Sequence, residues 1–145
     1  MFKHILIPTD GSALSDSAVT RGMRLAREAR ARVTALYAMP EYQVLTYDAG
    51  MMGDTRELFE TQTRARADTI LGHVKHIADE EGVPCDLVAV ANDRPYDAII
   101  HTARERGCDL ILMASHGRRG IEGFLLGSET HKVLTHSKIP VLVHR

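Results

Sequence analysis

Long hydrophobic runs, cysteine pairs and an excess of one charge are all missing from this sequence. The apolar run near the amino terminus, Ile5–Ile7, has three residues before Pro8, too few for a secretory signal or a membrane span. The two cysteines, Cys85 and Cys108, form no CxxC pattern, so we expect reduced, semi-buried thiols and a cytoplasmic protein. The formal net charge of −1 favours neither a nucleic-acid partner nor a membrane partner.

Several nucleotide-site motifs are also missing. The chain contains no G-x-x-x-x-G-K-[ST] phosphate loop and no G-x-G-x-x-G after the first apolar run, which excludes the common ATPase and dinucleotide-binding patterns. A receiver domain would need a second acid beside Asp10 and a lysine where His144 stands. Ser115-His116-Gly117 lacks the first glycine of a nucleophile elbow, and we expect His116 not to reach back to Ser115 as a base.

The composition that remains is that of an ordinary globular domain. Hydrophobic residues make up 44% of the chain and charged residues 26%, values that argue against disorder. A chain of 145 residues can bury a core without disulfides or a metal, so we expect residues 1–145 to form a single domain. His73-x-x-His76 has the spacing of two metal ligands on a helix, but no third ligand follows, so a solvated helix face is favoured.

Five short apolar runs alternate with segments of helical period. The runs are rich in Val, Ile and Leu without polar alternation, which predicts strands buried on both faces: 5–7, 33–38, 87–91, 110–114 and 141–143. Apolar faces at helical spacing occur over 18–29, 67–78 and 98–103, and a short fourth helix is expected from about Ser128 to His136. Ser12 or Ser15 can cap the first helix, and Gly82 and Pro84 end the second. The alternation predicts an α/β fold, an open doubly wound parallel sheet with helices on both faces.

The segment Pro40–Asp54 does not fit this alternation. It contains two tyrosines, two glycines and two adjacent methionines with little periodicity, and it is too long for a routine connection. We expect it to form a mobile flap or a surface for a partner.

Ligands of open α/β sheets bind beyond the carboxyl ends of the strands, which directs attention to two segments. The first strand leads into Pro8-Thr9-Asp10-Gly11-Ser12, where Asp10 either binds Mg²⁺ or a ribose hydroxyl, or caps the following turn. The fourth strand leads into a glycine-dense segment, 114–128, whose amides can approach a phosphate at the start of the last helix. Glycines that only turn corners of a surface loop explain that segment equally well. Arg118 and Arg119 either clamp phosphates or are solvated.

Together these segments resemble the universal stress protein family. The resemblance covers essentially the whole chain and rests on Pro8–Ser12, on Met113–Gly117, on Gly127-Ser128 nine residues later, and on the closing 139–143. It implies a five-stranded sheet of order 3-2-1-4-5, of the adenine nucleotide α-hydrolase-like type, and binding of ATP, AMP or ADP. It also implies a homodimer through the last strand, Val141–His144, an otherwise exposed edge.

Carried over by position, the resemblance implies a set of nucleotide-contacting residues. Asp10 would lie near the ribose or a metal, and Ala38 would touch the adenine. The full set is Pro8, Thr9, Asp10, Ala38, Met113, Ala114, His116, Gly117, Arg118, Gly127, Ser128, Glu129 and Thr130. One residue departs from the family's G-x-x-G-x9-G-[ST] motif: Ala114 stands at its first glycine, where a methyl group crowds a ligand and forbids unusual φ angles.

Three functions follow as hypotheses. The leading one is a nucleotide-dependent stress-response regulator, in which ATP stabilises one conformation or dimer contact for an unknown protein partner. The second is a homodimeric interaction protein of the same fold that binds no nucleotide. The third is a slow ATPase or phosphotransferase that uses Asp10 and Mg²⁺; the sequence offers no evident catalytic lysine or water-activating base.

Overall fold

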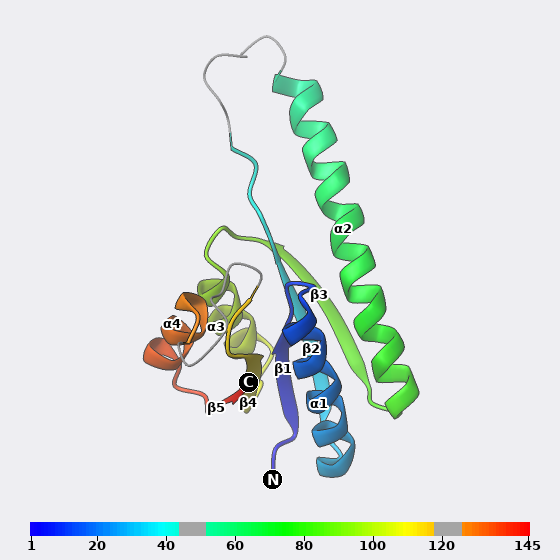
Figure 1. The fold of residues 1–145 in the computed structure, drawn as a ribbon, viewed down its shortest axis with the longest axis vertical. Helices are drawn as coiled ribbons and strands as arrows, with labels where there is room; N and C mark the ends of the chain where they lie inside the picture. The colour runs from blue at the N-terminus through cyan, green and yellow to red at the C-terminus, as the bar shows by residue number, and fades with distance from the viewer. Residues whose placement is uncertain (44–51, 118–125) are drawn as a thin grey trace.

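Five parallel strands form one sheet in the order β3-β2-β1-β4-β5 in the computed structural model of this chain (Figure 1). The structure describes residues 1–43, 52–117 and 126–145. The strands are β1 (His4–Pro8), β2 (Arg32–Met39), β3 (Cys85–Ala91), β4 (Leu110–Ala114) and β5 (Val141–His144). The predicted fold class and strand order are confirmed.

Two helices cover each face of the sheet. α1 (Ala13–Ala29) and α2 (Met52–Glu81) pack on one face, and α3 (Pro95–Glu105) and α4 (Ser128–His136) pack on the other. The side chains of β1 alternate between the two cores: Ile5 and Ile7 face α1 and α2, whereas Leu6 faces α3 and α4. All three are fully buried, as expected for the central strand of a covered parallel sheet.

The two edge strands are less buried than their apolar sequences predict. β1 and β4 are buried almost throughout, but Leu87 on β3 and Leu142 on β5 are 40% and 43% exposed. The expectation of burial on both faces was therefore wrong for β3 and β5. Periodicity alone does not separate an edge strand from a central one, because both carry the same Val-rich and Leu-rich runs.

The first helix begins at a serine cap, and the structure decides between the two candidates. Ser12 is the cap, because its Oγ accepts a hydrogen bond of 3.2 Å from the Ser15 N–H. At its other end α1 stops at Arg30, which adopts the left-handed conformation with φ of 56°. Glycine usually occupies this position, because a Cβ atom is disfavoured there.

α2 is much longer than predicted. Its buried face matches the expected one, with Ala67, Leu71, Val74 and Ala78 in the core, but the helix begins at Met52. The first half rises beyond the sheet (Figure 1) and is mostly polar and exposed, so it has no apolar stripe for a sequence to reveal. Good helix formers and the Arg56–Glu60 ion pair of 2.9 Å favour it instead.

The predicted flap Pro40–Asp54 lies mostly outside the described residues, since 44–51 are not described. Its last three residues belong to α2, so they are helical rather than irregular. In the three described stretches of chain, no helix combines the length and apolar character needed to span a membrane.

The cysteines lie in or near the core, whereas the paired histidines lie on the exposed side of α2. Cys85 is half-buried and Cys108 is buried, and burial raises the pKa of each thiol to about 11. Both thiols are therefore protonated and poorly nucleophilic near neutral pH. His73 and His76 pair with Asp16 at 3.8 Å and with a glutamate of their own helix, and the described residues contain no metal-binding group of three ligands.

His4 is a buried polar residue at the start of β1. Its Nε2 lies 2.7 Å from Thr34 Oγ1, and its Nδ1 has no hydrogen-bond partner among the described residues. Burial, together with the nearby Arg32 cation, lowers the pKa of His4 below its usual 6.5. A backbone carbonyl and two nearby carboxylates oppose this shift without cancelling it. The folded protein therefore holds His4 neutral.

This burial predicts a loss of stability in mild acid. As the pH falls through about 6.5, the unfolded chain binds a proton at His4 that the folded chain does not, so the free energy of unfolding decreases. In His4→Gln we expect a smaller difference in this free energy between about pH 7.5 and about pH 5. Urea unfolding at the two pH values measures it. The exposed His101→Gln is the matched control and should keep the wild-type difference; equal differences in all three proteins would contradict the prediction.

Candidate functional site

A cleft of about 650 Å³ lies along the carboxyl ends of the strands. It opens where β1 separates its two neighbours, β2 on one side and β4 on the other, which is the point at which the strand order reverses. The segments after β1 and β4 form part of its wall, and the first residues of α4 form another part. This is the position at which open α/β sheets bind ligands.

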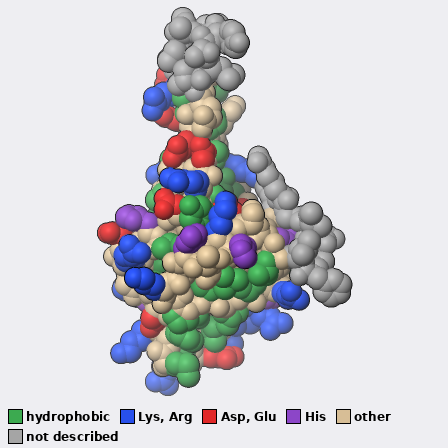
Figure 2. All heavy atoms as spheres, turned by 90° about the vertical axis from the view of Figure 1, so that its left-hand side faces the viewer, with side chains coloured by type: hydrophobic (Ala, Val, Ile, Leu, Met, Phe, Trp, Pro, Cys, Tyr) green, Lys and Arg blue, Asp and Glu red, His purple; other side chains and the backbone are tan. Residues whose placement is uncertain are grey.

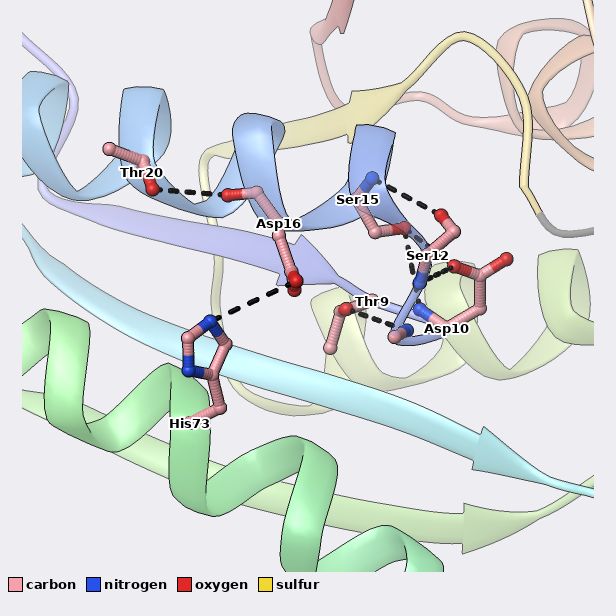
Figure 3. A network of polar contacts seen from close by, with 8 residues as sticks. Thr9, Asp10, Ser12, Ser15, Asp16, Thr20 and His73 are labelled. Carbon is pink, nitrogen blue, oxygen red and sulfur yellow. Dashed lines mark hydrogen bonds and ion pairs between the residues drawn. The ribbon is translucent and has the colours of Figure 1, made fainter.

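Asp10 organises the turn after β1 (Figure 3). Its Oδ1 accepts hydrogen bonds from the Ser12 N–H at 2.9 Å and from the Ser15 hydroxyl at 2.8 Å. The turn passes through Gly11, whose φ of 80° suits glycine, and the Gly11 N–H donates to Thr9 Oγ1 at 3.1 Å. The predicted turn-capping role of Asp10 is therefore present, and it fixes the carboxylate at the rim of the cleft.

Gly117 lies directly against this carboxylate. A Cβ atom at residue 117 would collide with Asp10 Oδ2. The segments after β1 and β4 thus approach so closely that only glycine fits without moving the acid.

The amino end of α4 is fastened to the end of β4. The Gly127 N–H donates to the Ser115 carbonyl at 2.7 Å, and the buried Thr130 hydroxyl donates to the Ala114 carbonyl at 2.9 Å. A Cβ on residue 127 would lie 3.1 Å from His116 Cα and 3.2 Å from the Ser115 oxygen. The last glycine of the motif therefore permits a close backbone crossing.

Two of these contacts use donors of the predicted site within the protein itself. A threonine hydroxyl could donate to a phosphate, but the Thr130 hydroxyl donates its hydrogen to Ala114. The Gly127 amide likewise donates to protein, not outward. The first intrahelical bond of α4 runs from His131 N–H to the Gly127 carbonyl at 3.0 Å. The amides of 128–130 lie in the first turn of α4 and have no acceptor within the helix.

Glu129 also has a structural partner. Its Oε2 accepts a hydrogen bond of 2.8 Å from the Tyr96 N–H, in the first turn of α3. The residue before that helix, Arg94, makes no side-chain capping bond, so the carboxylate of Glu129 serves as the cap. The contact ties the amino ends of α3 and α4 together at the cleft.

Ala114 sits in regular strand structure. It is the last residue of β4 and pairs with His144 of β5, and its φ is not positive, so the glycine that the motif expects is not needed for backbone conformation here. The next two residues contradict a second expectation, because His116 Nδ1 does lie 3.3 Å from Ser115 Oγ. Ser115 is buried and is not part of the cleft wall, so this contact does not present a nucleophile to a ligand.

The structure brings almost all the sequence-predicted site residues to this one cleft. Arg118 and the glycines at 120 and 123 lie outside the described residues. The others all line the cleft: Pro8, Thr9, Asp10, Ala38, Met113, Ala114, His116, Gly117, Gly127, Ser128, Glu129 and Thr130.

Sequence reasoning missed several polar residues of the wall, among them Asn92, Asp93 and Arg66. Asn92 and Asp93 follow β3, and a polar pair directly after an apolar run could have signalled them. Asp93 accepts from the Glu41 N–H at 2.9 Å and from Gln43 Nε2 at 2.7 Å, which ties the end of β2 to the end of β3. Arg66 lines the cleft from α2, and no local sequence pattern predicts this position.

The whole chain, residues 1–145, matches the pattern of the universal stress protein family. The chain belongs to this family. A relative from Bacillus subtilis, universal stress protein YxiE, is 33% identical over 149 aligned positions that cover all of both chains.

Solved structures of the family share the fold described here. The protein MJ0577 of Methanocaldococcus jannaschii superposes with a TM-score of 0.83 at 26% identity, covering 99% of this chain and 95% of that one. A universal stress protein solved in complex with cAMP superposes with a TM-score of 0.72 at 24% identity, covering 99% and 97% of the two chains. The bound nucleotide is a property of that second protein.

The fastening of α4 can be tested by Thr130→Val, which keeps the side-chain shape and removes the hydroxyl. Thr130 is only 2% exposed, so the Ala114 carbonyl would lose its hydroxyl donor in a buried place. We expect the free energy of unfolding to fall by about 1–2 kcal/mol.

The matched control is Thr135→Val on the same helix. Thr135 Oγ1 donates to the His131 carbonyl at 2.8 Å, but it is exposed and water can replace it. Denaturant unfolding should show a change within about 0.5 kcal/mol for this variant. Equal losses in the two variants would show that the buried bond has no special role.

Proposed function

We propose that this protein binds an adenine nucleotide in the cleft, with ATP as the ligand, and acts as a nucleotide-dependent regulator in a stress response. The observation that carries the proposal is the convergence of the ends of β1 and β4 with the start of α4 on one cleft. Family membership supports it, as does the relative that was solved with cAMP. The cleft volume of about 650 Å³ lies within the range of small-molecule sites.

The two ends of the cleft differ in chemistry. Leu36, Ala38, Ile99 and Met113 supply apolar wall, which suits a base. The amides of 128–130 open α4, and the positive end of the helix dipole favours phosphate there. We therefore place the adenine near Ala38 and the phosphates near Ser128.

A magnesium ion would fit at Asp10, because one carboxylate together with phosphate oxygens is an ordinary magnesium ligand set. When bound, the ion would offset phosphate charge. The two hydrogen bonds that Asp10 Oδ1 accepts hold this carboxylate at the rim of the cleft, where the ion would lie. The slow ATPase stays a prediction, and loss of turnover in Asp10→Ala would support it.

Nucleotide binding is tested with Gly117→Ala. The added methyl would collide with Asp10 Oδ2 and displace the carboxylate or the segment after β4. We expect the dissociation constant for ATP, measured by titration calorimetry, to rise at least about tenfold, or about 1.4 kcal/mol. AMP and cAMP titrations with the wild-type protein then show which adenine nucleotide is preferred.

Gly72→Ala is the control for this change. Residue 72 is in the middle of α2, and an added Cβ there meets no atom within 4 Å. This variant should bind ATP like the wild type. The proposal fails if the wild-type protein shows neither heat nor a thermal shift in excess ATP and carries no adenine nucleotide after purification.

A homodimer through β5 is the second proposal. β5 ends the strand order, and within the described residues no strand follows it on its outer side. Leu142 on β5 and Leu134 on α4 are exposed, and Figure 2 shows hydrophobic side chains on the side of the molecule that carries α4. An exposed edge strand with apolar neighbours is suited to pairing with a second copy.

Leu142→Glu tests the dimer, because a carboxylate on the paired edge strand would be buried or would face its own copy. We expect the wild type to sediment as a dimer and the variant to shift towards monomer in analytical ultracentrifugation. Leu58→Glu, at an exposed position on the distant half of α2, should leave the mass unchanged. A monomeric wild type, or an unaltered dimer in Leu142→Glu, would rule out this interface.

A further inference from the structure

A second hollow, of about 440 Å³, lies at the opposite edge of the sheet from the cleft. It is formed by the segment before β1, the link from α1 to β2, and the link from α2 to β3, at the lower end of the molecule in Figure 1. We call it the basal hollow. Its wall consists of Lys3, Ala26, Arg27, Arg30, Ala31, Arg32, Gly82, Val83 and Pro84. Four of these nine residues are cationic and none is acidic.

The charges of the basal hollow are only partly neutralised. Arg27 donates to Glu81 at 2.6 Å and is paired. Across the described parts of the chain, no ion pair holds Lys3, Arg30 or Arg32. Three exposed cations therefore remain around one concavity.

Asp109, which lies beside Lys3, forms no ion pair with these three cations within the described residues. Asp109 accepts from the Lys3 N–H at 2.9 Å and from the His4 N–H at 3.0 Å, so both its oxygens are bonded to backbone. Burial opposes its ionisation, but these backbone bonds keep the pKa of Asp109 below its usual value. Its charge lowers the local potential without forming an ion pair with Arg30 or Arg32.

Helix dipoles at this edge work against an anion. α1 and α2 both end here, and each carboxyl end carries about half a negative charge. Basic residues near such ends usually serve to stabilise the helices, and that role explains part of the cluster. Three unpaired cations against about one negative charge from two helix ends and one from Asp109 leave a positive surplus of about one charge.

The conformation of Arg30 indicates that the surplus positive charge does more than stabilise the helix ends. It occupies the left-handed cap position of α1, with φ of 56° and ψ of 39°, where glycine is the favourable residue. An arginine there is less stable than a glycine would be, and what it adds is a guanidinium on the wall of the hollow. Guanidinium groups bind phosphate through two parallel hydrogen bonds.

We propose that the basal hollow binds a small anion with two or more phosphate groups, at a site separate from the cleft. A concave wall of this volume suits a compact molecule, whereas a duplex or a membrane surface would touch only its rim. The inference does not depend on the proposed adenine site, because the two hollows share no residue.

The test uses the full chain and tripolyphosphate as the probe. Titration calorimetry of the wild type should show binding that weakens as salt is raised. Arg30→Gly and Arg32→Gln should each raise the dissociation constant about tenfold, the loss of one charge-assisted contact. Arg30→Gly should unfold at a temperature no lower than the wild type, because glycine suits the cap, so weaker binding would not reflect misfolding.

Two controls separate this site from the cleft and from general charge. Arg64→Gln removes an exposed cation elsewhere on α2 and should leave tripolyphosphate affinity unchanged. Amide NMR shifts on adding the probe should appear at 30–32 and 82–83. The proposal is overturned if the wild type binds no tripolyphosphate, if shifts appear only at 128–130, or if all three arginine variants weaken binding equally.

Discussion

The cleft depends on how the amino end of α4 is fastened to the end of β4. Two hydrogen bonds make this connection, from Gly127 N–H to the Ser115 carbonyl and from the Thr130 hydroxyl to the Ala114 carbonyl. They hold the helix so that its first amides open at the carboxyl edge of the sheet. Without them, α4 would still cover the core through Val133, but its amino end would be fastened to α3, through Glu129, and no longer to the end of β4. The binding geometry that we propose thus rests on hydrogen bonds within the protein itself.

The second constraint is the close approach of Asp10 and Gly117. Asp10 is held from its own side by Ser12 and Ser15, so its position follows from the cap of α1. Gly117 then fits only because it lacks a Cβ. A helix cap on one side of the switch point and a glycine on the other therefore set the width of the cleft between them. This explains why the Pro-Thr-Asp-Gly-Ser turn and the distant glycine segment occur in the same sequence.

Much of this arrangement could be predicted from the sequence, and the exceptions have physical reasons. The strands and the residues that follow β1 and β4 are local signals, since apolar runs, glycines and cap residues are read within a few positions. Arg66, Asn92 and Asp93 reach the cleft through the packing of α2 and β3, which local patterns do not contain. The hydroxyl of Thr130 and the carboxylate of Glu129 have the right chemistry for a ligand, but the fold directs them to Ala114 and Tyr96. A side chain's type shows what it can bond, and only the packing shows which bond it makes.

The first half of α2 was not predicted for another reason. A helix that extends beyond the sheet has no buried face, so its sequence carries no apolar stripe.

The parallel sheet also gives the molecule an electrical direction. Every strand points the same way and every connecting helix returns, so helix amino ends lie at the cleft edge and carboxyl ends at the opposite edge. At the cleft edge, main-chain amides can attract phosphate without lysine or arginine, and the wall there can even include three carboxylates, Asp10, Asp93 and Glu129, each held by hydrogen bonds. At the opposite edge the backbone repels anions, so any anion site must be built from side-chain cations in excess. The basal hollow has that excess of cations. One of them, Arg30, stands at a left-handed position where glycine would be more favourable. Because of this backbone polarity, an anion would be bound by main-chain amides at the cleft edge and by side-chain cations at the opposite edge.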